Sequence, residues 1–238
     1  MRVDVRAVPR RSSAPDEYED ATFPAASAEL SGNLRVAVAD GATTSSFAGN
    51  WARLLVSAWA DGTLDAEGEA VPGLARRWRE SVDLDGLSWF AADKLRVGSH
   101  AALVGLELRE NGSWTALSVG DCCLFVVRAD TLIESFPARR PEELDGRPAL
   151  IGTGMSAEEF RRCVRLAAGW WQPDDTLCLM SDALGRWFLH AALVAQSAPW
   201  RTLQAAAERP ESFLAWIERL RECGALQPDD VTLLSVRP

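Results

Sequence analysis

The chain has 238 residues, nearly half of them hydrophobic, and a formal net charge of -9. This length permits one large domain or two small ones, and we expect a single domain over residues 1–238. The net charge argues against nucleic acid as a partner, because a phosphate backbone would be repelled. The apolar runs are far shorter than the roughly 20 residues of a membrane span, which argues against a membrane protein.

The amino terminus and the cysteines indicate the compartment. The first segment is charged and has no apolar core, so it is unlike a secretory signal peptide. The five cysteines have irregular spacings and include no Cys-x-x-Cys pair. This pattern supports neither a disulfide framework nor a zinc knuckle. We therefore expect a protein of the reducing cytoplasm.

The first third of the chain predicts a strand and a helix. Residues 1–30 are rich in proline, serine, alanine and acidic residues, and we expect them to start the domain loosely. The side chains of residues 34–39 alternate in character, and this segment ends at an Asp-Gly pair. That is the pattern of a strand followed by a turn. The apolar spacing over 47–60 predicts a helix, with Ser45 or Ser46 as its N-cap.

Further strands and helices follow. Apolar segments bounded by turn residues predict strands over 101–108, 114–119, 123–127, 163–168, 176–180 and 231–236. Helical spacing recurs over about 72–95, 183–196 and 211–223. Residues 138–160 are charged and rich in turn residues, which predicts a flap-like insertion. Because the strands cluster and the helices group between them, the pattern favours an α+β layered sandwich.

Four aspartates stand at the ends of apolar strands, namely Asp40, Asp121, Asp182 and Asp229. A carboxylate in that position is anchored by the sheet on one side and open to water on the other. Several of them brought together repel each other unless a cation neutralises them. Carboxylate oxygens favour Mg²⁺ or Mn²⁺. For each aspartate taken alone, an ordinary turn residue is the alternative.

The contexts of these acids resemble, in order, the type 2C protein serine/threonine phosphatases, and among them a compact bacterial branch. The matching segments are Glu19-Asp20-Ala21, Val38-Ala39-Asp40-Gly41, Gly98-Ser99-His100-Ala101, Val119-Gly120-Asp121-Cys122, Ser181-Asp182-Ala183-Leu184 and Asp229-Asp230-Val231-Thr232. The resemblance implies a four-layer αββα sandwich, in which two antiparallel sheets pack face to face and are flanked by helices.

The resemblance also implies a site for two divalent cations, Mn²⁺ or Mg²⁺. Asp40 would bridge the two ions, and Gly41 would supply a backbone carbonyl to one of them, which requires a close backbone approach. Asp182 and Asp229 would complete the ligand set of the first ion. With Asp40, they form the expected catalytic set.

Three further acids receive implied roles. Glu19 would hold the second ion, and Asp20 would lie in the outer shell and orient a bound water. Asp121 is different, because its counterpart in the family supports a tight turn. We expect Asp121 to be structural.

The implied activity is hydrolysis of phosphoserine and phosphothreonine by a water activated between two cations. The partner would be a phosphoprotein, and the enzyme would act opposite a cognate serine/threonine kinase. We expect the flap at 138–160 to govern the choice of substrate through Arg139 and Arg140, because loops between core strands carry recognition.

Two departures from the family pattern support an alternative, a phosphatase-like regulatory or binding module with weak or no turnover. Ala42 stands where the family has a histidine, and Pro15 stands where it has a phosphate-contacting arginine. Arg10 and Arg11 are the candidates to replace that arginine. His100, at a strand start, is a further candidate to approach the site.

A cysteine phosphatase is the rival mechanism. Cys122 and Arg128 have the Cys-x5-Arg spacing. The residues between them are apolar strand sequence without glycine, which cannot form a tight phosphate-binding loop. We therefore expect Cys122 and Cys123 to be strand residues.

Overall fold

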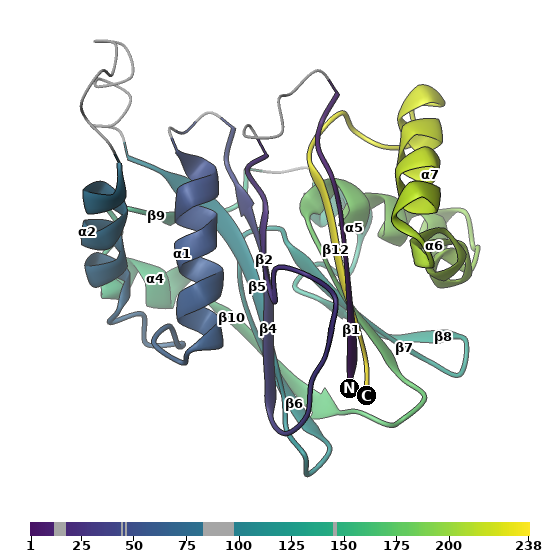
Figure 1. Cartoon of the computed structure of the whole chain (residues 1–238), viewed down its shortest axis with the longest axis horizontal. Helices are drawn as coiled ribbons and strands as arrows, with labels where there is room; N and C mark the ends of the chain where they lie inside the picture. Colours follow the sequence, from purple (N-terminus) through teal and green to yellow (C-terminus); the bar gives the residue numbers. More distant parts are fainter. Residues whose placement is uncertain (12–17, 44, 46, 83–97, 145–146) are drawn as a thin grey trace.

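The computed structural model describes residues 1–11, 18–43, 45, 47–82, 98–144 and 147–238. These residues form two six-stranded sheets that pack face to face, with helices on both outer faces (Figure 1). All the strand pairings described are antiparallel. The expected α+β four-layer sandwich is confirmed.

The first sheet has the strand order β3–β1–β12–β11–β7–β8. Its strands are β1 (Arg2–Val8), β3 (Ala28–Glu29), β7 (Cys123–Arg128), β8 (Thr131–Phe136), β11 (Thr176–Met180) and β12 (Val231–Arg237). Strand β1 pairs with β12 along its whole length, so the expectation of a loose start over 1–30 is wrong. The alternating sequence of β1 suits a strand inside a sheet, since its polar side chains lie on one face.

The second sheet has the order β10–β6–β5–β4–β2, and β9 pairs with β5. Its strands are β2 (Ala21–Phe23), β4 (Leu34–Gly41), β5 (His100–Leu108), β6 (Ser113–Val119), β9 (Ile151–Gly152) and β10 (Arg165–Trp170). Within the expected flap at 138–160, β9 therefore belongs to the sheet. The strand expected from 163 begins at Arg165, because a short helix precedes it.

Each sheet has its own helices. Those of the second sheet are α1 (Ala48–Ala60), α2 (Val71–Ser81) and α4 (Ala157–Cys163). Those of the first sheet are α5 (Asp182–Leu189), α6 (Pro199–Ala207) and α7 (Pro210–Glu222). Two short helical turns, η2 (Pro141–Leu144) and η3 (His190–Val194), complete the described helices. None of the helices in the described ranges combines the length and apolar character needed to cross a bilayer.

Two predicted helix ends differ from the structure. Phe47, with φ 55°, precedes α1, and no side chain caps this helix. Ser45 does not act as the cap, because its Oγ lies 3.3 Å from Nδ1 of His100; Ser46 lies outside the described residues. Helix α2 ends at Ser81, and most of the remaining expected helix, 83–95, also lies outside the described residues.

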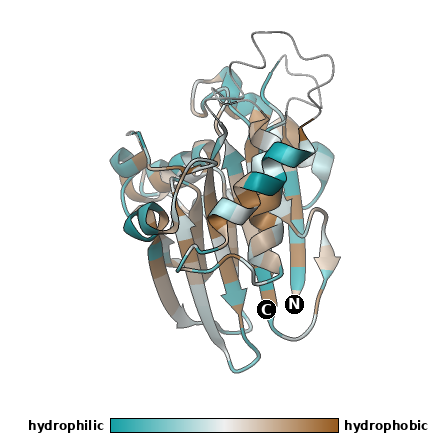
Figure 2. Cartoon of the chain, turned by 90° about the vertical axis from the view of Figure 1, so that its left-hand side faces the viewer, coloured by the Kyte–Doolittle hydropathy of each residue, from teal (hydrophilic) through white to brown (hydrophobic). Residues whose placement is uncertain are grey.

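Alternation along β4 determines which side chains reach the interior between the sheets. Val36 and Val38 pack into the core between the sheets, whereas Ala37 and Ala39 pack under α1. The strands are largely apolar, and hydrophilic segments lie on the outer helices and loops (Figure 2). By the same alternation, Asp40 lies on the inner side of β4, at the end of the core between the sheets.

Candidate metal centre

Acidic side chains from separate segments of the chain gather around the end of β4. Asp40 ends that strand, Asp182 opens α5 directly after β11, and Asp229 precedes β12. Burial raises the pKa of Asp40 well above its usual value, and the negative charges of Asp20 and Asp182 raise it further. The charges of Asp121 and Asp229 also raise the pKa of Asp40. The fold therefore concentrates negative charge at the place that the sequence predicts.

Asp182 and Asp40 interact directly. Burial raises the pKa of Asp182, the charge of Asp229 adds to this, and a hydrogen bond with the Asp40 side chain lowers it. Asp182 also accepts a hydrogen bond of 2.5 Å from the backbone N–H of Ala183. As the first residue of α5, it lies at the positive end of the helix dipole, which favours its charged form.

Asp20 is buried and incompletely bonded. One of its carboxylate oxygens accepts a hydrogen bond of 2.5 Å from the hydroxyl of Thr232, which also bonds to Tyr18. The other oxygen has no hydrogen-bond partner among the described residues. Burial raises the pKa of Asp20 to about 8. Such an acceptor is the kind of group that a bound cation or its water would satisfy.

Asp121 lies in a turn within electrostatic reach of Asp182. It follows Gly120, whose φ of 99° suits a glycine in a turn. Burial raises the pKa of the Asp121 carboxyl to about 7, and the charge of Asp182 contributes. The side chain thus shares the electrostatic field of the acidic group. A strand-end turn dipeptide gives no sign of this, since Asp121 and Asp182 are far apart in the sequence.

The backbone of Glu19 lies close to Gly41. A Cβ atom on Gly41 would lie 2.7 Å from the Glu19 carbonyl oxygen and 2.8 Å from the carbonyl carbon of Ala48, so no other residue fits there. The backbones of Glu19 and Ala48 thus pack directly against Gly41. Burial raises the pKa of Glu19, whose carboxylate lies 3.5 Å from Nη1 of Arg10.

The residues suit a divalent cation, although they do not form a finished ligand set. In the described part of the chain, no three His, Cys, Asp or Glu side chains converge closely enough to hold a metal ion. Burial, mutual repulsion and the unpartnered oxygen of Asp20 all favour the binding of positive charge. An all-oxygen donor set fits Mn²⁺ or Mg²⁺.

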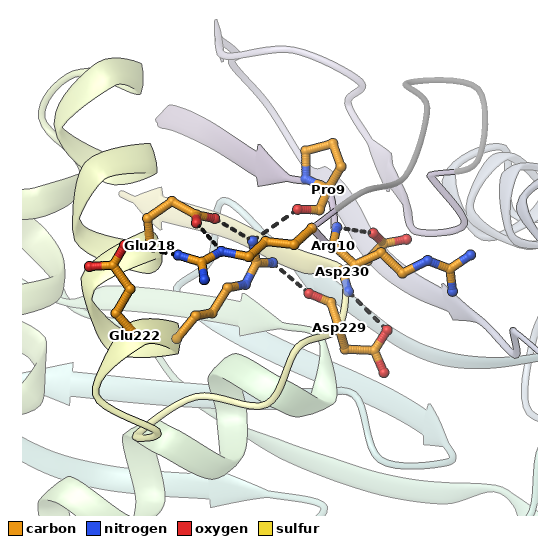
Figure 3. Close-up of polar contacts among 8 residues, drawn as sticks. Pro9, Arg10, Glu218, Glu222, Asp229 and Asp230 are labelled. Atoms are coloured by element: carbon orange, nitrogen blue, oxygen red, sulfur yellow. Dashed lines mark hydrogen bonds and ion pairs between the residues drawn. The ribbon is translucent and has the colours of Figure 1, made fainter.

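Arg221, a buried arginine, links the loop of Asp229 to the segment of Pro9. Figure 3 shows Pro9 and Asp229 near Glu218 of α7. The side chain of Arg221, on α7, is only 2% exposed. Its guanidinium donates hydrogen bonds to the backbone carbonyls of Asp229, at 2.6 Å, and Pro9, at 3.0 Å. It also forms an ion pair with Glu218 at 2.7 Å. Sequence analysis missed Arg221, because an arginine on a helix is usually a solvated residue.

Asp230 fastens the amino-terminal segment to the same loop. It accepts hydrogen bonds from the backbone N–H groups of Arg10, at 2.8 Å, and Glu19, at 2.9 Å. Asp230 is buried, and these bonds satisfy both of its oxygens. The two neighbouring aspartates thus differ: Asp229 contributes charge, and Asp230 positions the segments that carry Arg10 and Glu19.

Arg10 and Arg11 point to different partners. Nη1 of Arg10 donates a hydrogen bond of 2.9 Å to Thr43 and lies beside Glu19. Arg11 instead forms ion pairs with two glutamates of α7, at 2.5 and 3.0 Å. Only Arg10 extends toward the acidic group. Pro15 lies outside the described residues.

His100 lies next to Ala42. The backbone N–H of Ala42 donates a hydrogen bond of 2.9 Å to the His100 carbonyl. Ala102 follows His100 by two residues on β5. It is opposite Asp40 and packs between the sheets. By this alternation, the His100 side chain lies on the same face of the sheet as Asp40.

The cysteine mechanism has no structural support. Cys122 and Cys123 are buried, and burial raises the pKa of both thiols, which disfavours a thiolate nucleophile. Arg128 lies at the far end of β7, where it forms an ion pair with Asp175 at 2.7 Å. Cys123 begins β7, as expected, and Cys122 directly precedes this strand.

Solved phosphatase structures share this fold. The photosystem II phosphatase PBCP is 14% identical, with a TM-score of 0.61 over 99% of this chain and 98% of its own. The catalytic domain of PstP, a serine/threonine phosphatase known from Mycobacterium tuberculosis, in complex with two manganese ions, is 17% identical, with a TM-score of 0.60 over 98% and 97%. A bacterial serine phosphatase is 14% identical, with a TM-score of 0.58 over 98% and 96%.

The chain has the fold of the type 2C, or PPM, serine/threonine phosphatases. At these identities, the likeness shows the fold. Searches with family models and against curated proteins found no match. The fold that the resemblance implies is thus confirmed.

Proposed function

We propose that this chain is a protein serine/threonine phosphatase that requires two divalent cations, Mn²⁺ or Mg²⁺. The observation that carries this proposal is the gathering of half-buried, mutually repelling carboxylates from separate segments at one end of a phosphatase fold. Its substrate would be a phosphoserine or phosphothreonine protein, phosphorylated by a cognate kinase in the cytoplasm.

Different acidic residues would bind the two ions. When bound, two divalent cations would lower the pKa of a water and neutralise charge on the phosphoryl oxygens. Asp40 is the proposed bridging ligand, and Asp182 and Asp229 are the proposed ligands of the first ion. Glu19 and the carbonyl of Gly41 would serve the second ion.

Asp20 would orient a water through its unpartnered oxygen. Arg10 is the proposed contact to the substrate phosphate, because it extends from an anchored backbone to Thr43 and Glu19. A guanidinium matches the geometry of phosphate oxygens well. His100 is the proposed donor of a proton to the leaving hydroxyl, in the role left open by Ala42.

A cleft beside Asp121 offers a path for the peptide around the phosphorylated residue. It has a volume of about 370 Å³ and is lined by Asp121, Pro137, Arg147 and Arg165, among others. The flap therefore contributes through Arg147. Arg139 and Arg140 have less direct access, since they form ion pairs with glutamates of β8 and η2.

The decisive experiment measures hydrolysis of para-nitrophenyl phosphate and of a phosphothreonine peptide, with Mn²⁺ and after exhaustive treatment with EDTA. We expect turnover that depends on the metal and survives alkylation with iodoacetamide. The alternative, a binding module with weak or no turnover, is favoured by Ala42. Calorimetric binding of Mn²⁺ without hydrolysis of either substrate would support that alternative and contradict the enzyme.

A further inference from the structure

A second cavity lies on the outer face of the first sheet, far from the acidic group. Its volume is about 190 Å³, and it lies between the sheet and α6. It is lined by residues near the carboxyl end of β12, whereas Asp229 precedes the other end of this strand. The cavity therefore belongs neither to the candidate metal centre nor to the cleft beside Asp121.

The pairing of β1 with β12 places two arginines side by side at the rim of the cavity, which is formed by Arg2, Asp4, Ser235 and Arg237. Arg2 is directly opposite Arg237, and Asp4 is directly opposite Ser235. Like charges opposite each other destabilise a sheet. Both guanidinium groups bond to the one carboxylate of Asp4, Arg2 at 3.0 Å and Arg237 at 2.5 Å. Two positive charges share one negative charge.

Hydrogen-bond donors remain available at this rim. Arg237 uses only Nη2, so its Nε and Nη1 have no partner among the described residues. Ser235 is 9% exposed, and its hydroxyl also has no partner within the described ranges. Both residues line the cavity. This hydroxyl is a second donor for an acceptor oxygen in the cavity.

The charged residues that line the cavity balance each other. Arg2 and Arg237 are positive, and Asp4 and Glu208 are negative. Arg6 does not line the cavity, although it donates a hydrogen bond of 3.3 Å to the backbone carbonyl of Glu208. Because the carboxylate of Asp4 already accepts hydrogen bonds from both arginines, the unused N–H groups of Arg237 are the charged donors left for a carboxylate in the cavity.

The floor of the cavity is apolar. Cys178, Leu203 and Leu233 line it, and each is at most 3% exposed. An apolar cavity of about 150 Å³ is large enough to hold benzene. The cavity thus has room for one ring or a short branched chain, with the charged rim at one side.

We propose that this cavity binds a small organic carboxylate with a single ring or a branched aliphatic chain. Its carboxylate would accept hydrogen bonds from Arg237 and Ser235, and its apolar part would pack on Leu203 and Leu233. This proposal does not depend on the phosphatase activity.

Three probes of nearly equal size test it: benzoate, benzamide and benzylamine, which are an anion, a neutral amide and a cation. Binding is measured by saturation-transfer NMR on the whole chain, without metal or phosphate. We expect benzoate to bind with a Kd on the order of 1 mM, the range of a ligand with few atoms. Benzamide should bind more weakly and benzylamine least of the three.

Variants locate the binding. Ala207→Phe fills the cavity from α6 and should abolish benzoate binding. Arg237→Gln and Ser235→Ala should each weaken it about tenfold or more, a loss of about one hydrogen bond to a charged group. Arg165→Gln, an exposed arginine on β10, is the control and should leave binding unchanged. Thermal melts verify that each variant is folded.

Three outcomes would overturn the proposal. The first is benzylamine binding as tightly as benzoate, because the charge argument then fails. The second is benzoate binding that persists in folded Ala207→Phe, because the ligand then lies elsewhere. The third is no benzoate binding to the unmodified chain at concentrations far above 1 mM.

Discussion

The guanidinium of Arg221 donates a 2.6 Å hydrogen bond to the backbone carbonyl of Asp229. Through a second carbonyl, that of Pro9, the same side chain reaches the segment that carries Arg10. A residue outside the acidic group thus fixes two loops that converge on it. This arrangement makes the position of the Asp229 carboxylate dependent on α7.

We expect Arg221→Met to weaken Mn²⁺ binding about tenfold and to lower the free energy of unfolding by roughly 3 kcal/mol, since hydrogen bonds from a charged donor contribute about 1.5–3 kcal/mol each. Calorimetry and urea unfolding measure the two effects. Glu222→Gln, on the same helix, is the control and should leave Mn²⁺ affinity unchanged. Equal Mn²⁺ affinity in a folded Arg221→Met protein would show that Arg221 is only structural.

Arg10→Ala should lower kcat/KM for a phosphopeptide by about tenfold to a hundredfold, because a positive charge beside the phosphoryl group is lost. Arg11→Ala is the matched control. It removes the ion pairs to α7 but no group near Glu19, so its rate should change less than about twofold. The assignment fails if the two variants lose activity equally.

Asp40→Asn should reduce the rate at saturating Mn²⁺ by at least about a hundredfold. In EDTA the same variant should melt at a higher temperature, because it relieves repulsion from Asp20 and Asp182. Asp121→Asn should gain thermal stability in EDTA as well, with a much smaller loss of rate. A fully active Asp40→Asn protein would end the two-metal proposal.

His100→Gln should slow hydrolysis of a phosphoserine peptide by about a hundredfold, the lower range for general acid catalysis. Para-nitrophenyl phosphate should be affected much less, because its leaving group needs no proton. Comparison of the two substrates therefore separates a proton donor from a structural residue. A uniform loss on both substrates would contradict the proposed role.

The metal-free protein should lose stability as the pH rises. Burial raises the pKa of Asp20 to about 8 and that of Asp121 to about 7, and both values exceed the 3.8 of an unperturbed aspartate. The folded state therefore binds protons that the unfolded chain releases above about pH 4, and unfolding becomes easier up to about pH 8.

Between pH 5 and pH 8, we expect a loss of about 2 kcal/mol or more, since one pKa unit corresponds to about 1.4 kcal/mol. Urea unfolding in EDTA at several pH values measures it. Saturating Mn²⁺ should remove most of the dependence. Stability that increases with pH over this window in EDTA would contradict the predicted sign.

Local patterns sufficed for the parts of the site that lie at strand ends. Asp40, Asp182 and Asp229 each follow or precede an apolar run, and a sheet brings such ends together, so their clustering was predictable. The close packing of the Glu19 backbone against Gly41 was not predictable from these patterns, because it joins separate segments of the chain. The helices α1 and α7 have clear periodicity and occur where expected.

Other features depend on contacts between distant segments. Asp230 bonds the backbone of Glu19, and Arg221 bonds that of Pro9, although both pairs are more than two hundred residues apart. No spacing rule reveals such pairs. Strand β1 was missed because its composition is polar on one face, and Arg2 and Asp4 resemble surface residues until the opposing strand is known.

The pairing of β1 with β12 has a consequence for synthesis. Val3 is opposite Val236, so β1 obtains this neighbour only after more than two hundred further residues have been made. At roughly 5–20 residues per second, this wait lasts on the order of 10 to 50 s. Asp229 also emerges at that late stage, so the sheet and the acidic group can be completed only together. A nascent chain stalled before β12 would therefore expose an unpaired β1 edge, the kind of surface that chaperones protect.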